Sequence, residues 1–455
     1  MHLKNGHKKI DLQRGKLTIT QRARHVKRRG KKTAVFCANR GFKAIFAVFC
    51  TGKRPQTGSF HSFHYTARVL LCRCICNFGR NTVYCTLRGI VIWRLFMAKR
   101  KVCVLFGGVS SEHEVSLLSA TSVIRNIPAD QYEIIPVGIT KKGRWLYYPG
   151  PLDRLTDGSW ETAVDCVPAF LSPDTTDRGL VKCIEGQFVL QKIDIVFPVL
   201  HGRGGEDGTV QGLLELSGLP YVGCGVLSSA LCMDKAAANL VMDAAGIPRC
   251  EWDYMTRAEL DDMDAIADRV AAKLGWPIFV KPANAGSSVG ISKAHDKEEL
   301  FAAVKTALAH DSRIVFERFV QGQEVECAVI GNDEISGTLP GEILASQEFY
   351  TYDDKYIAGT SQVVIPARLS PEKLQEVRDV ALRAYRTLCC TGLARVDFFV
   401  EKDTGRVLLN EINTLPGFTS ISMYPKLMIE TGMTYGELLC RLMDLALERK
   451  EEPNG

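Results

Sequence analysis

The sequence predicts an α/β protein with a doubly wound N-terminal domain, a small central α+β domain and a C-terminal α+β domain. Two observations lead to this prediction: strands, glycine-rich loops and helices alternate from about residue 100, and a long antiparallel hairpin lies near the C-terminus. The 455 residues allow two to four domains at about 100–200 residues each. A content of 46% hydrophobic and 24% charged residues is that of an ordinary globular protein.

The first fifth of the chain differs in charge from the rest. Residues 1–96 carry 21 Lys and Arg but a single acid, Asp11, whereas residues 97–455 carry 36 Lys and Arg and 50 Asp and Glu. We interpret 1–96 as a basic extension that is not part of the folded protein, with Met97 as the start. A targeting segment and a nucleic-acid-binding arm are the alternatives, but the acidic remainder argues against a nucleic-acid partner.

Cysteine use and hydropathy indicate the compartment. The 16 cysteines do not have the spacing of a disulfide framework or of a zinc site. No apolar run approaches the roughly 18 residues that cross a bilayer, and neither residue 1 nor Met97 begins a secretory signal. We therefore expect a cytoplasmic protein with no membrane partner and no structural metal.

The N-terminal domain, 97–220, follows a strand–loop–helix order. Gly107 and Gly108 turn the first strand towards a helix that Ser110 or Ser111 would cap. A polar stretch at 150–190 has no predicted element, and a glycine-rich loop with a helix follows the last strand. The predicted strands are 101–106, 132–140 and 193–200, and the first predicted helix is 114–127.

The rest of the chain divides into two further domains. The central domain, 221–311, has a helix at 234–248 and two strands that flank a second glycine-rich loop. The C-terminal domain, 312–450, begins with a strand at 313–320 and contains the long hairpin. A last helix, at about 433–448, ends the predicted fold.

The glycine-rich loop KPANAGSSVG lies between predicted strands 276–282 and 289–294. Its small residues expose backbone N–H groups, which can cradle phosphate oxygens, and Lys281 begins it. We expect the loop to fold over a nucleotide; a plain β-turn with a surface lysine is the alternative. Because the sequence has no GxxxxGK[ST] motif, it does not predict a P-loop protein.

The hairpin at 394–413 brings two carboxylates together. A three-residue Asp-Thr-Gly turn, with glycine where positive φ is needed, would place Lys402 opposite Arg406. That register puts Asp397 opposite Glu411, and side chains two residues apart share a face of the sheet. Opposed carboxylates among apolar neighbours repel each other, so we expect a cation between them.

The side chains on this face suit a hard divalent cation. Asn413 joins Asp397 and Glu411 there, and carboxylate and amide oxygens are the ligands of Mg²⁺ that bridges nucleotide phosphates. We therefore predict a metal site formed by these three residues. The alternative is an ion cluster in which Arg395, on the same face, neutralises the carboxylates.

Six segments occur in order between residue 100 and about residue 445. They are FGGVSSEHEVSL, HGRGGEDGTVQG, MDKAAANL, VKPANAGSSVG, YTYDDKYI and LNEINTLPGFTSISMYP. Together they resemble the D-alanine–D-alanine ligase family, and the resemblance does not extend to 1–96. It implies an ATP-grasp fold with an N-terminal doubly wound (pre-ATP-grasp) domain, and ATP-dependent ligation of two D-alanines for cell-wall peptidoglycan.

The resemblance assigns roles to the residues that match the family's motifs. The implied ATP-binding residues are Lys235, Lys281, Ser288, Glu317, Val320, Glu324 and Asn410. The implied catalytic residues are Glu112, Ser287, Tyr356, Arg395, Gly417 and Ser422. The implied substrate-binding residues are Val115, His201, Lys355 and Met423. The implied metal ligands are again Asp397, Glu411 and Asn413, for two Mg²⁺ ions or for Mn²⁺ instead.

Particular contacts follow from the same resemblance. Glu112 pairs with the ammonium of the first D-alanine, and Ser287 and Tyr356 link it to the second-substrate site. His201 lies near the first substrate's carboxylate, although a buried histidine with satisfied ring nitrogens is the alternative. Lys355 belongs to a loop that closes over the γ-phosphate.

The remaining implied contacts concern the nucleotide and the transition state. Glu317 and the Val320 backbone contact the adenine, and Glu324 takes the ribose hydroxyls. Arg395 and the Gly417 N–H hold the oxyanion that forms when an amine attacks an acyl phosphate.

Other functions remain as alternatives. One is another ATP-grasp carboxylate–amine ligase, including the D-Ala–D-Lac and D-Ala–D-Ser variants, and another is a nucleotide-binding module without activity. Tyr356 stands where ester-forming relatives carry histidine, which favours the dipeptide. We expect D-alanine and ATP as small-molecule partners, and a homodimer.

Overall fold

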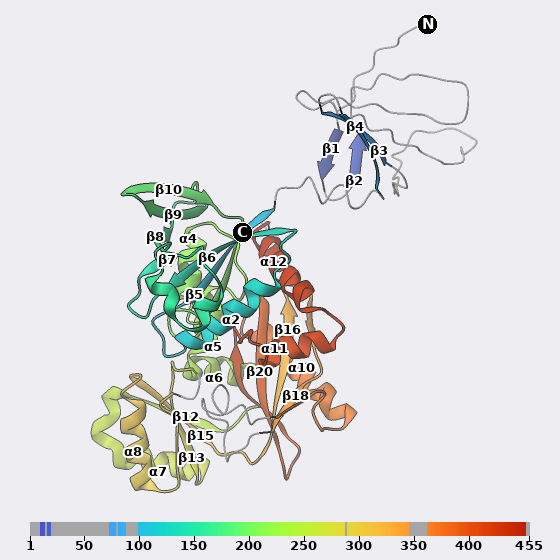
Figure 1. Cartoon of the computed structure of the whole chain (residues 1–455). Coiled ribbons are helices and arrows are strands. Elements are labelled where there is room, and N and C mark those ends of the chain that lie inside the picture. Colours follow the sequence, from blue (N-terminus) through green and yellow to red (C-terminus); the bar gives the residue numbers. More distant parts are fainter. Residues whose placement is uncertain are drawn as a thin grey trace, which may run out of the picture. The chain divides into compact units, whose positions relative to one another are not determined.

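Figure 1 shows the computed structural model, which describes residues 99–451 without 287–288 and 345–361, and four short strands upstream. The chain divides into two compact units, Met1–Ala98 and Lys99–Gly455. In the first unit the strands form two antiparallel pairs, which the sequence pattern does not predict. They are β1 (Ile10–Gln13), β2 (Lys16–Ile19), β3 (Cys72–Phe78) and β4 (Asn81–Leu87).

A seven-stranded mixed sheet forms the N-terminal domain. Its order is β10-β9-β8-β7-β6-β5-β11, in which β11, β5 and β6 are parallel and the other pairs antiparallel. Strand β11 is buried throughout, as expected of a parallel strand covered on both faces. The strands are β5 (Arg100–Gly107), β6 (Tyr132–Ile139), β7 (Trp145–Tyr147), β8 (Val167–Leu171), β9 (Gly179–Ile184), β10 (Gln187–Lys192) and β11 (Ile195–Leu200).

Two expectations for this domain are wrong. The polar stretch 150–190 contains strands. At the edge of the sheet β10 is exposed or half-buried along its length, and its apolar residues 188–190 are consecutive, so it lacks the alternation of a half-buried strand. Neither Ser110 nor Ser111 caps the first helix, which begins at His113; the Ser110 hydroxyl instead donates to the His201 carbonyl at 2.7 Å. The helices are α2 (His113–Asn126), α3 (Asp153–Thr156), the 3₁₀ segment η1 (Ser159–Thr162) and α4 (Thr209–Leu216).

The central domain is a four-stranded antiparallel sheet ordered β12-β15-β13-β14, with α7 and α8 packed on it (Figure 1, lower left). Strand β15, predicted to begin the C-terminal domain, is hydrogen-bonded between β12 and β13. The elements are α5 (Val226–Met233), α6 (Lys235–Ala244), β12 (Trp252–Thr256), η2 (Arg257–Asp262), α7 (Met263–Leu274), β13 (Ile278–Pro282), β14 (Ser292–Ala294), α8 (Lys297–Ala307) and β15 (Arg313–Arg318).

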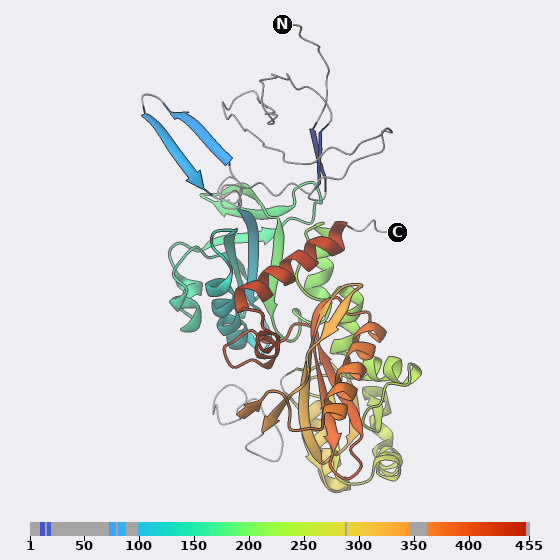
Figure 2. The same ribbon diagram turned by 90° about the vertical axis from the view of Figure 1, so that its right-hand side faces the viewer.

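The C-terminal domain has a second antiparallel sheet, β19-β18-β16-β20-β21, and β17 also pairs with β16. Helix α10 packs on this sheet, whereas α12 lies along the N-terminal domain, where Leu439 shares a core with Phe106 (Figure 2). The elements are β16 (Gly322–Gly331), β17 (Ile335–Gly337), β18 (Gly341–Leu344), β19 (Gln362–Val364), α10 (Pro371–Thr387), β20 (Gly392–Glu401), β21 (Val407–Asn413), α11 (Met423–Glu430) and α12 (Tyr435–Glu451).

The predicted pairing of Asp397 with Glu411 is confirmed, but the turn and the register between the turn and this pair differ from the prediction. The Glu401 N–H donates to the Arg406 carbonyl, so four residues form the turn and the register there is one residue out of step with the prediction. A β-bulge beside Asp397, with Asn410 as the extra residue, restores the predicted pairing.

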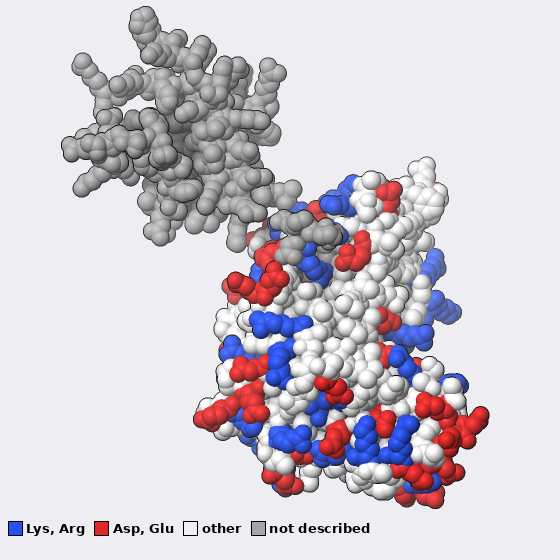
Figure 3. Space-filling view, turned by 180° about the vertical axis from the view of Figure 1, so that it is seen from behind, with Lys and Arg blue, Asp and Glu red and all other residues white. Residues whose placement is uncertain are grey.

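The surface and the cysteines agree with an ordinary globular domain. Figure 3 shows acidic and basic side chains interspersed over one face of the described chain. The ten cysteines in residues 99–451 are all free thiols. Within the part that the structure describes, no helix is both long enough and apolar enough to span a membrane.

Candidate functional site

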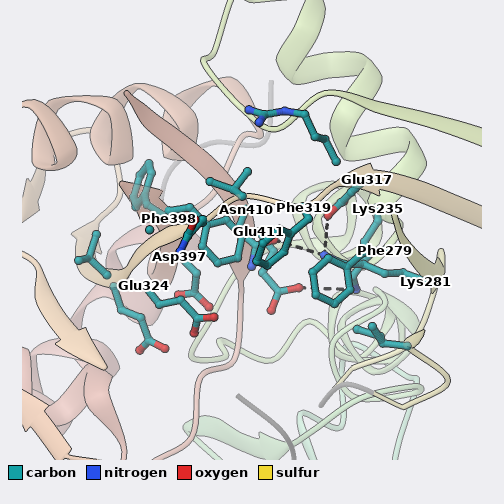
Figure 4. Close-up of a pocket in the computed structure, with 18 of the residues that line it drawn as sticks. Lys235, Phe279, Lys281, Glu317, Phe319, Glu324, Asp397, Phe398, Asn410 and Glu411 are labelled. Carbon is teal, nitrogen blue, oxygen red and sulfur yellow. Dashed lines mark hydrogen bonds and ion pairs between the residues drawn. The ribbon is translucent and has the colours of Figure 1, made fainter. Parts of the chain in front are cut away.

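A cavity of about 450 Å³ lies between the central sheet and the C-terminal sheet (Figure 4). Strands β13 and β15 supply one wall, and β16, β20 and β21 supply the other. Eight of the predicted ATP-binding and metal-binding residues line it. They are Lys235, Lys281, Glu317, Val320, Glu324, Asp397, Asn410 and Glu411.

Lys281 is the buried cation of this cavity. Its Nζ donates to Glu317 Oε2 at 2.5 Å and to Asn410 Oδ1 at 3.5 Å. Burial works to lower the pKa of Lys281, but the nearby carboxylates, Glu317 first and then Glu411, together raise it, so the ammonium stays charged. Oε2 of Glu317 accepts from Lys281, and a carboxylate has further lone pairs with which it could make the implied contact with adenine.

Lys235 reaches the cavity from the first position of helix α6. Its Nζ donates to the Ala285 carbonyl at 2.8 Å and lies 3.6 Å from Glu411 Oε2. The same side chain therefore contacts the glycine-rich loop and the hairpin that carries the carboxylates.

Four phenylalanines, none of them a predicted site residue, also line the cavity: Phe279, Phe319, Phe398 and Phe399. The rings of Phe279 and Phe319 lie 6.1 Å apart and form an apolar wall suited to a flat base. Each lies two residues from a charged residue of the cavity, Lys281 and Glu317 respectively. Period-two alternation along these strands is the signal that could have identified them.

Arg395 lies between two carboxylates. Its Nε donates to Asp397 Oδ1 at 2.7 Å and lies 2.9 Å from Glu326 Oε2, and its Nη2 donates to Asp397 Oδ2 at 2.6 Å. Burial works to lower the pKa of Arg395, but these carboxylates raise it well above its usual value. Part of the alternative to a metal site, an ion cluster in which Arg395 neutralises the carboxylates, is thus present as the pair of Arg395 with Asp397. Glu326, directly across the ladder from Asp397, was missed although it alternates with Glu324.

The metal prediction has one independent observation in its favour. Asn413 Oδ1 is buried without a hydrogen-bond partner, on the face that holds Asp397 and Glu411. A buried amide oxygen without a donor is rare, and a cation would satisfy it. Among the described residues no three His, Cys, Asp or Glu are arranged to hold a metal. In the predicted site, two carboxylates and an amide would leave nucleotide phosphates and water to complete the coordination shell.

The Glu112 carboxylate occupies a recess built by two glycine-rich motifs. A Cβ added at Gly202 would lie 2.5 Å from Glu112 Oε2, and one at Gly286 would lie 2.8 Å from it. Glu112 is itself buried. A side chain at either position would displace this carboxylate, so both loops approach it with bare backbone.

His201 is a buried histidine with a partner at each ring nitrogen. Nε2 lies 3.2 Å from the Ser119 hydroxyl, and Nδ1 lies 3.1 Å from the Leu415 carbonyl. Burial lowers its pKa, which favours the neutral ring. The Phe418 N–H also donates to Ser119, so His201 and Ser119 together hold the loop that contains Gly417.

A second carboxylate, Glu206, lies near Glu112 and was not predicted. Its Oε2 accepts the Gly202 N–H at 2.6 Å. Burial and the nearby Glu112 raise its pKa to about 8. The proximity of Glu206 to Glu112 arises only when the chain folds. The sequence therefore gives no sign of it beyond the presence of Glu206 in HGRGGEDG.

The loop before α11 contains three implied site residues. Gly417 is half-buried, and the Ser422 hydroxyl accepts the Thr419 N–H at 3.0 Å. The Met423 side chain is buried in a core with Tyr424, so only its backbone N–H, in the first turn of α11, remains to bind a substrate.

The other implied residues are less informative. The Val115 side chain is buried in helix α2. Ser287, Ser288, Lys355 and Tyr356 lie outside the described residues and remain predictions.

Two antiparallel sheets around a cavity with buried lysines and paired carboxylates, beside a mixed-sheet domain, define the ATP-grasp class of ligases. Family models described as "D-ala D-ala ligase N-terminus" and "D-ala D-ala ligase C-terminus" match residues 101–224 and 241–444. The chain belongs to the D-alanine–D-alanine ligase family and has the ATP-grasp fold of that family.

Individual relatives support this membership. The D-alanine–D-alanine ligases of Caldicellulosiruptor bescii and Acetivibrio thermocellus are each 51% identical, over 78% and 77% of this chain and 97% and 96% of their own. The crystal structure of the VanG D-Ala:D-Ser ligase from Enterococcus faecalis is 39% identical, with a TM-score of 0.70 over 77% of this chain and all of that one. The Coxiella burnetii D-alanine–D-alanine ligase structure is 34% identical, with a TM-score of 0.69 over 78% of this chain and 95% of that one.

Proposed function

We propose that this protein ligates two D-alanines to D-alanyl-D-alanine, with conversion of ATP to ADP and phosphate, as a step in making peptidoglycan precursors. The observation that supports this most directly is the Glu112 recess. It offers an ammonium group a buried carboxylate beside the glycine-rich loop that borders the nucleotide cavity.

The first step activates a carboxylate. A carboxylate does not react with an amine at neutral pH, because oxide is a poor leaving group. The first D-alanine carboxylate therefore attacks the γ-phosphorus of ATP, and an acyl phosphate and ADP form. Lys235 and Lys281 are suited to bind the phosphate oxygens, since both reach the cavity as cations. A divalent cation held by Asp397, Glu411 and Asn413 would neutralise phosphate charge there.

The second step forms the peptide bond. The neutral amine of the second D-alanine attacks the acyl carbon. Phosphate leaves with the bonding electrons and takes up the proton that the nitrogen loses. We assign the oxyanion to Arg395 and the Gly417 N–H. Carboxylates occupy Nε and Nη2 of Arg395, so Nη1 is the group assigned to the substrate.

Three finer statements belong to the same proposal. The enzyme uses two Mg²⁺ ions, which metal titration in the presence of ADP would count. It acts in the cytoplasm as a homodimer, which light scattering of the purified chain would test. Ser287, Ser288, Lys355 and Tyr356 complete the site from the two segments outside the described residues.

The deciding experiment measures phosphate release from ATP with and without D-alanine, with the product identified by mass. We expect release to require D-alanine and to yield the dipeptide in equal amount. Glu112→Gln keeps the shape of the side chain but removes its charge, and it should raise the KM for D-alanine strongly. Phosphate release without dipeptide would reject the proposed reaction.

A second candidate acceptor is D-serine. The similarity to the VanG D-Ala:D-Ser ligase is the observation that favours it. A hydrophobic pocket rejects an added hydroxyl only by roughly 10²-fold, so overall similarity alone does not exclude this product.

A further inference from the structure

We propose that Asn284 is a positioning residue for the nucleotide, which ties the base of the glycine-rich loop to helix α6 and to strand β15. This inference rests on the proposed ATP-dependent function and extends it to a residue behind the cavity wall. Asn284 follows the end of β13, within the motif KPANAGSSVG.

The Asn284 side chain bridges two carboxylates. Its Nδ2 donates to Asp234 Oδ2 at 3.1 Å and to Asp311 Oδ2 at 3.0 Å, and its backbone N–H donates to Asp311 Oδ2 at 2.8 Å. Ionised carboxylates only accept hydrogen bonds, so the amide must present its NH₂ group to both. A neutral residue with two donors suits this place, because it links two anions without adding charge.

Each carboxylate anchors a different element. Asp234 is the N-cap of α6, accepts the Ala237 N–H at 3.0 Å and pairs with Arg313. Asp311 accepts the Ser312 N–H at 2.6 Å just before β15. Burial works to raise the pKa of Asp311, but hydrogen bonds led by those from Asn284 bring it below its usual value. The bridge therefore joins an ionised Asp311 to an Asp234 that pairs with the Arg313 guanidinium.

The same bridge controls the position of Lys235. The Lys235 N–H donates to the Ala283 carbonyl at 3.0 Å, and its Nζ donates to the Ala285 carbonyl at 2.8 Å. These two carbonyls flank Asn284. A shift of Asn284 would therefore move both the loop and the lysine that the proposed mechanism assigns to phosphate. Displacements near 1 Å can cost roughly 10²-fold in rate.

Three variants in the full chain separate positioning from a general structural role. Asn284→Ala removes the bridge, and Asn284→Asp replaces it with a third carboxylate. Asn284→Asp combined with Asp311→Asn exchanges the two side chains, so that the amide at position 311 can donate to the carboxylate at position 284. The matched control is Asp296→Ala, because Asp296 caps α8 in the same domain by accepting the Glu299 N–H at 2.8 Å.

The readouts are the KM values for ATP and D-alanine, ADP binding by calorimetry, and the melting temperature. We expect Asn284→Ala to raise the KM for ATP and the Kd for ADP about tenfold, and the KM for D-alanine less than about threefold. Asn284→Asp should be worse, and the exchange variant should recover part of the loss. Asp296→Ala should lower the melting temperature without changing either nucleotide constant.

Two outcomes would overturn the proposal: nucleotide constants for Asn284→Ala within about twofold of the unaltered chain, or an exchange variant no better than Asn284→Asp. An unaltered chain that binds ADP but makes no dipeptide would reject the proposed ligase function instead. The ADP measurements would still test Asn284 in that case.

Discussion

Two neighbours of Asp397 have opposite effects on the stability of a charged side chain at this position. Repulsion from Glu411 across the ladder favours a neutral residue, whereas the two hydrogen bonds from Arg395 favour a charged one. The pair with Arg395 is direct and largely buried, so its loss dominates. The metal ion that we propose between the carboxylates would add a third reason for a charged residue at this position.

Asp397→Asn should therefore lower both stability and turnover. Arg395 keeps Glu326, so we expect a loss of about 1–3 kcal/mol in the free energy of unfolding, with Mg²⁺-dependent phosphate release abolished. Thermal melts without nucleotide and a phosphate assay measure the two effects. Asp403→Asn, in the exposed turn, is the control. An equal or higher melting temperature would show that carboxylate repulsion outweighs the pair with Arg395.

The raised pKa of Glu206 makes the stability of the folded chain depend on pH. Its pKa rises from 4.5 to about 8, because burial and Glu112 disfavour its charged form. Between those values the folded chain holds a proton that the unfolded chain has released, so this residue's contribution to stability falls as pH rises from about 4.5 to 8. Glu206→Gln should melt like the unaltered chain near pH 5 and at a higher temperature near pH 8. The exposed Glu430→Gln should show no such divergence, and parallel curves for Glu206→Gln would refute the raised pKa.

At this scale the sequence predicts residue types better than their contacts. Lys281, Glu317 and Asn410 are assigned to the nucleotide by the family resemblance, and all three line one cavity. Their mutual hydrogen bonds are not predictable, because they join segments far apart in the chain. The proximity of Glu206 to Glu112 is hidden for the same reason.

At the scale of elements, the pairing of Asp397 with Glu411 is predicted correctly although the turn and the bulge of the hairpin are not. The predicted turn is one residue too short, and the bulge at Asn410 compensates by one residue. Bulges depend on local twist and on partners such as Lys281, which binds the Asn410 side chain. Period-two alternation alone cannot reveal them.

The turn from β5 towards α2 allows a matched pair of substitutions. Gly107 and Gly108 both have positive φ, but a Cβ at Gly107 would lie 2.2 Å from the Ile139 carbonyl oxygen, whereas one at Gly108 would have only Leu200 Cδ2 nearby, at 3.8 Å. Gly108→Ala should cost about 1–3 kcal/mol of stability from backbone strain alone. Gly107→Ala should cost more, because a backbone atom cannot move aside. Urea denaturation compares the two, and equal losses would contradict the steric argument.

For the whole molecule, the order of domains is predictable and their exact composition is not. Apolar runs locate β5, β6 and β11, because parallel central strands are buried on both faces. Strands β8–β10 lack that signal, because most of their residues are exposed or half-buried. Strand β15 joins the central sheet through pairing with β12 and β13, which no local pattern encodes.

A chain that begins at Met97 should fold and keep full activity. Every core residue that the structure describes lies between Val102 and Ala446, and the family models match from residue 101 onward. We expect the kcat, the KM for ATP and the melting temperature to equal those of the full chain. A loss of folding or activity on removal of 1–96 would give that basic segment a function.

The product should be D-Ala–D-Ala and not the ester D-Ala–D-lactate. Both acceptors carry a carboxylate and a methyl group. The site must therefore distinguish them by the amine of D-alanine, which arrives as ammonium, and the neutral hydroxyl of D-lactate. Tyr356 is neutral at pH 7 and does not repel the ammonium, whereas a protonated histidine there would repel it. Competition of D-alanine against D-lactate at about pH 7.5, with products separated by mass, tests this. Dominance of the ester would refute the role given to Tyr356, and a parallel competition with D-serine would show whether the similarity to the VanG ligase extends to its acceptor.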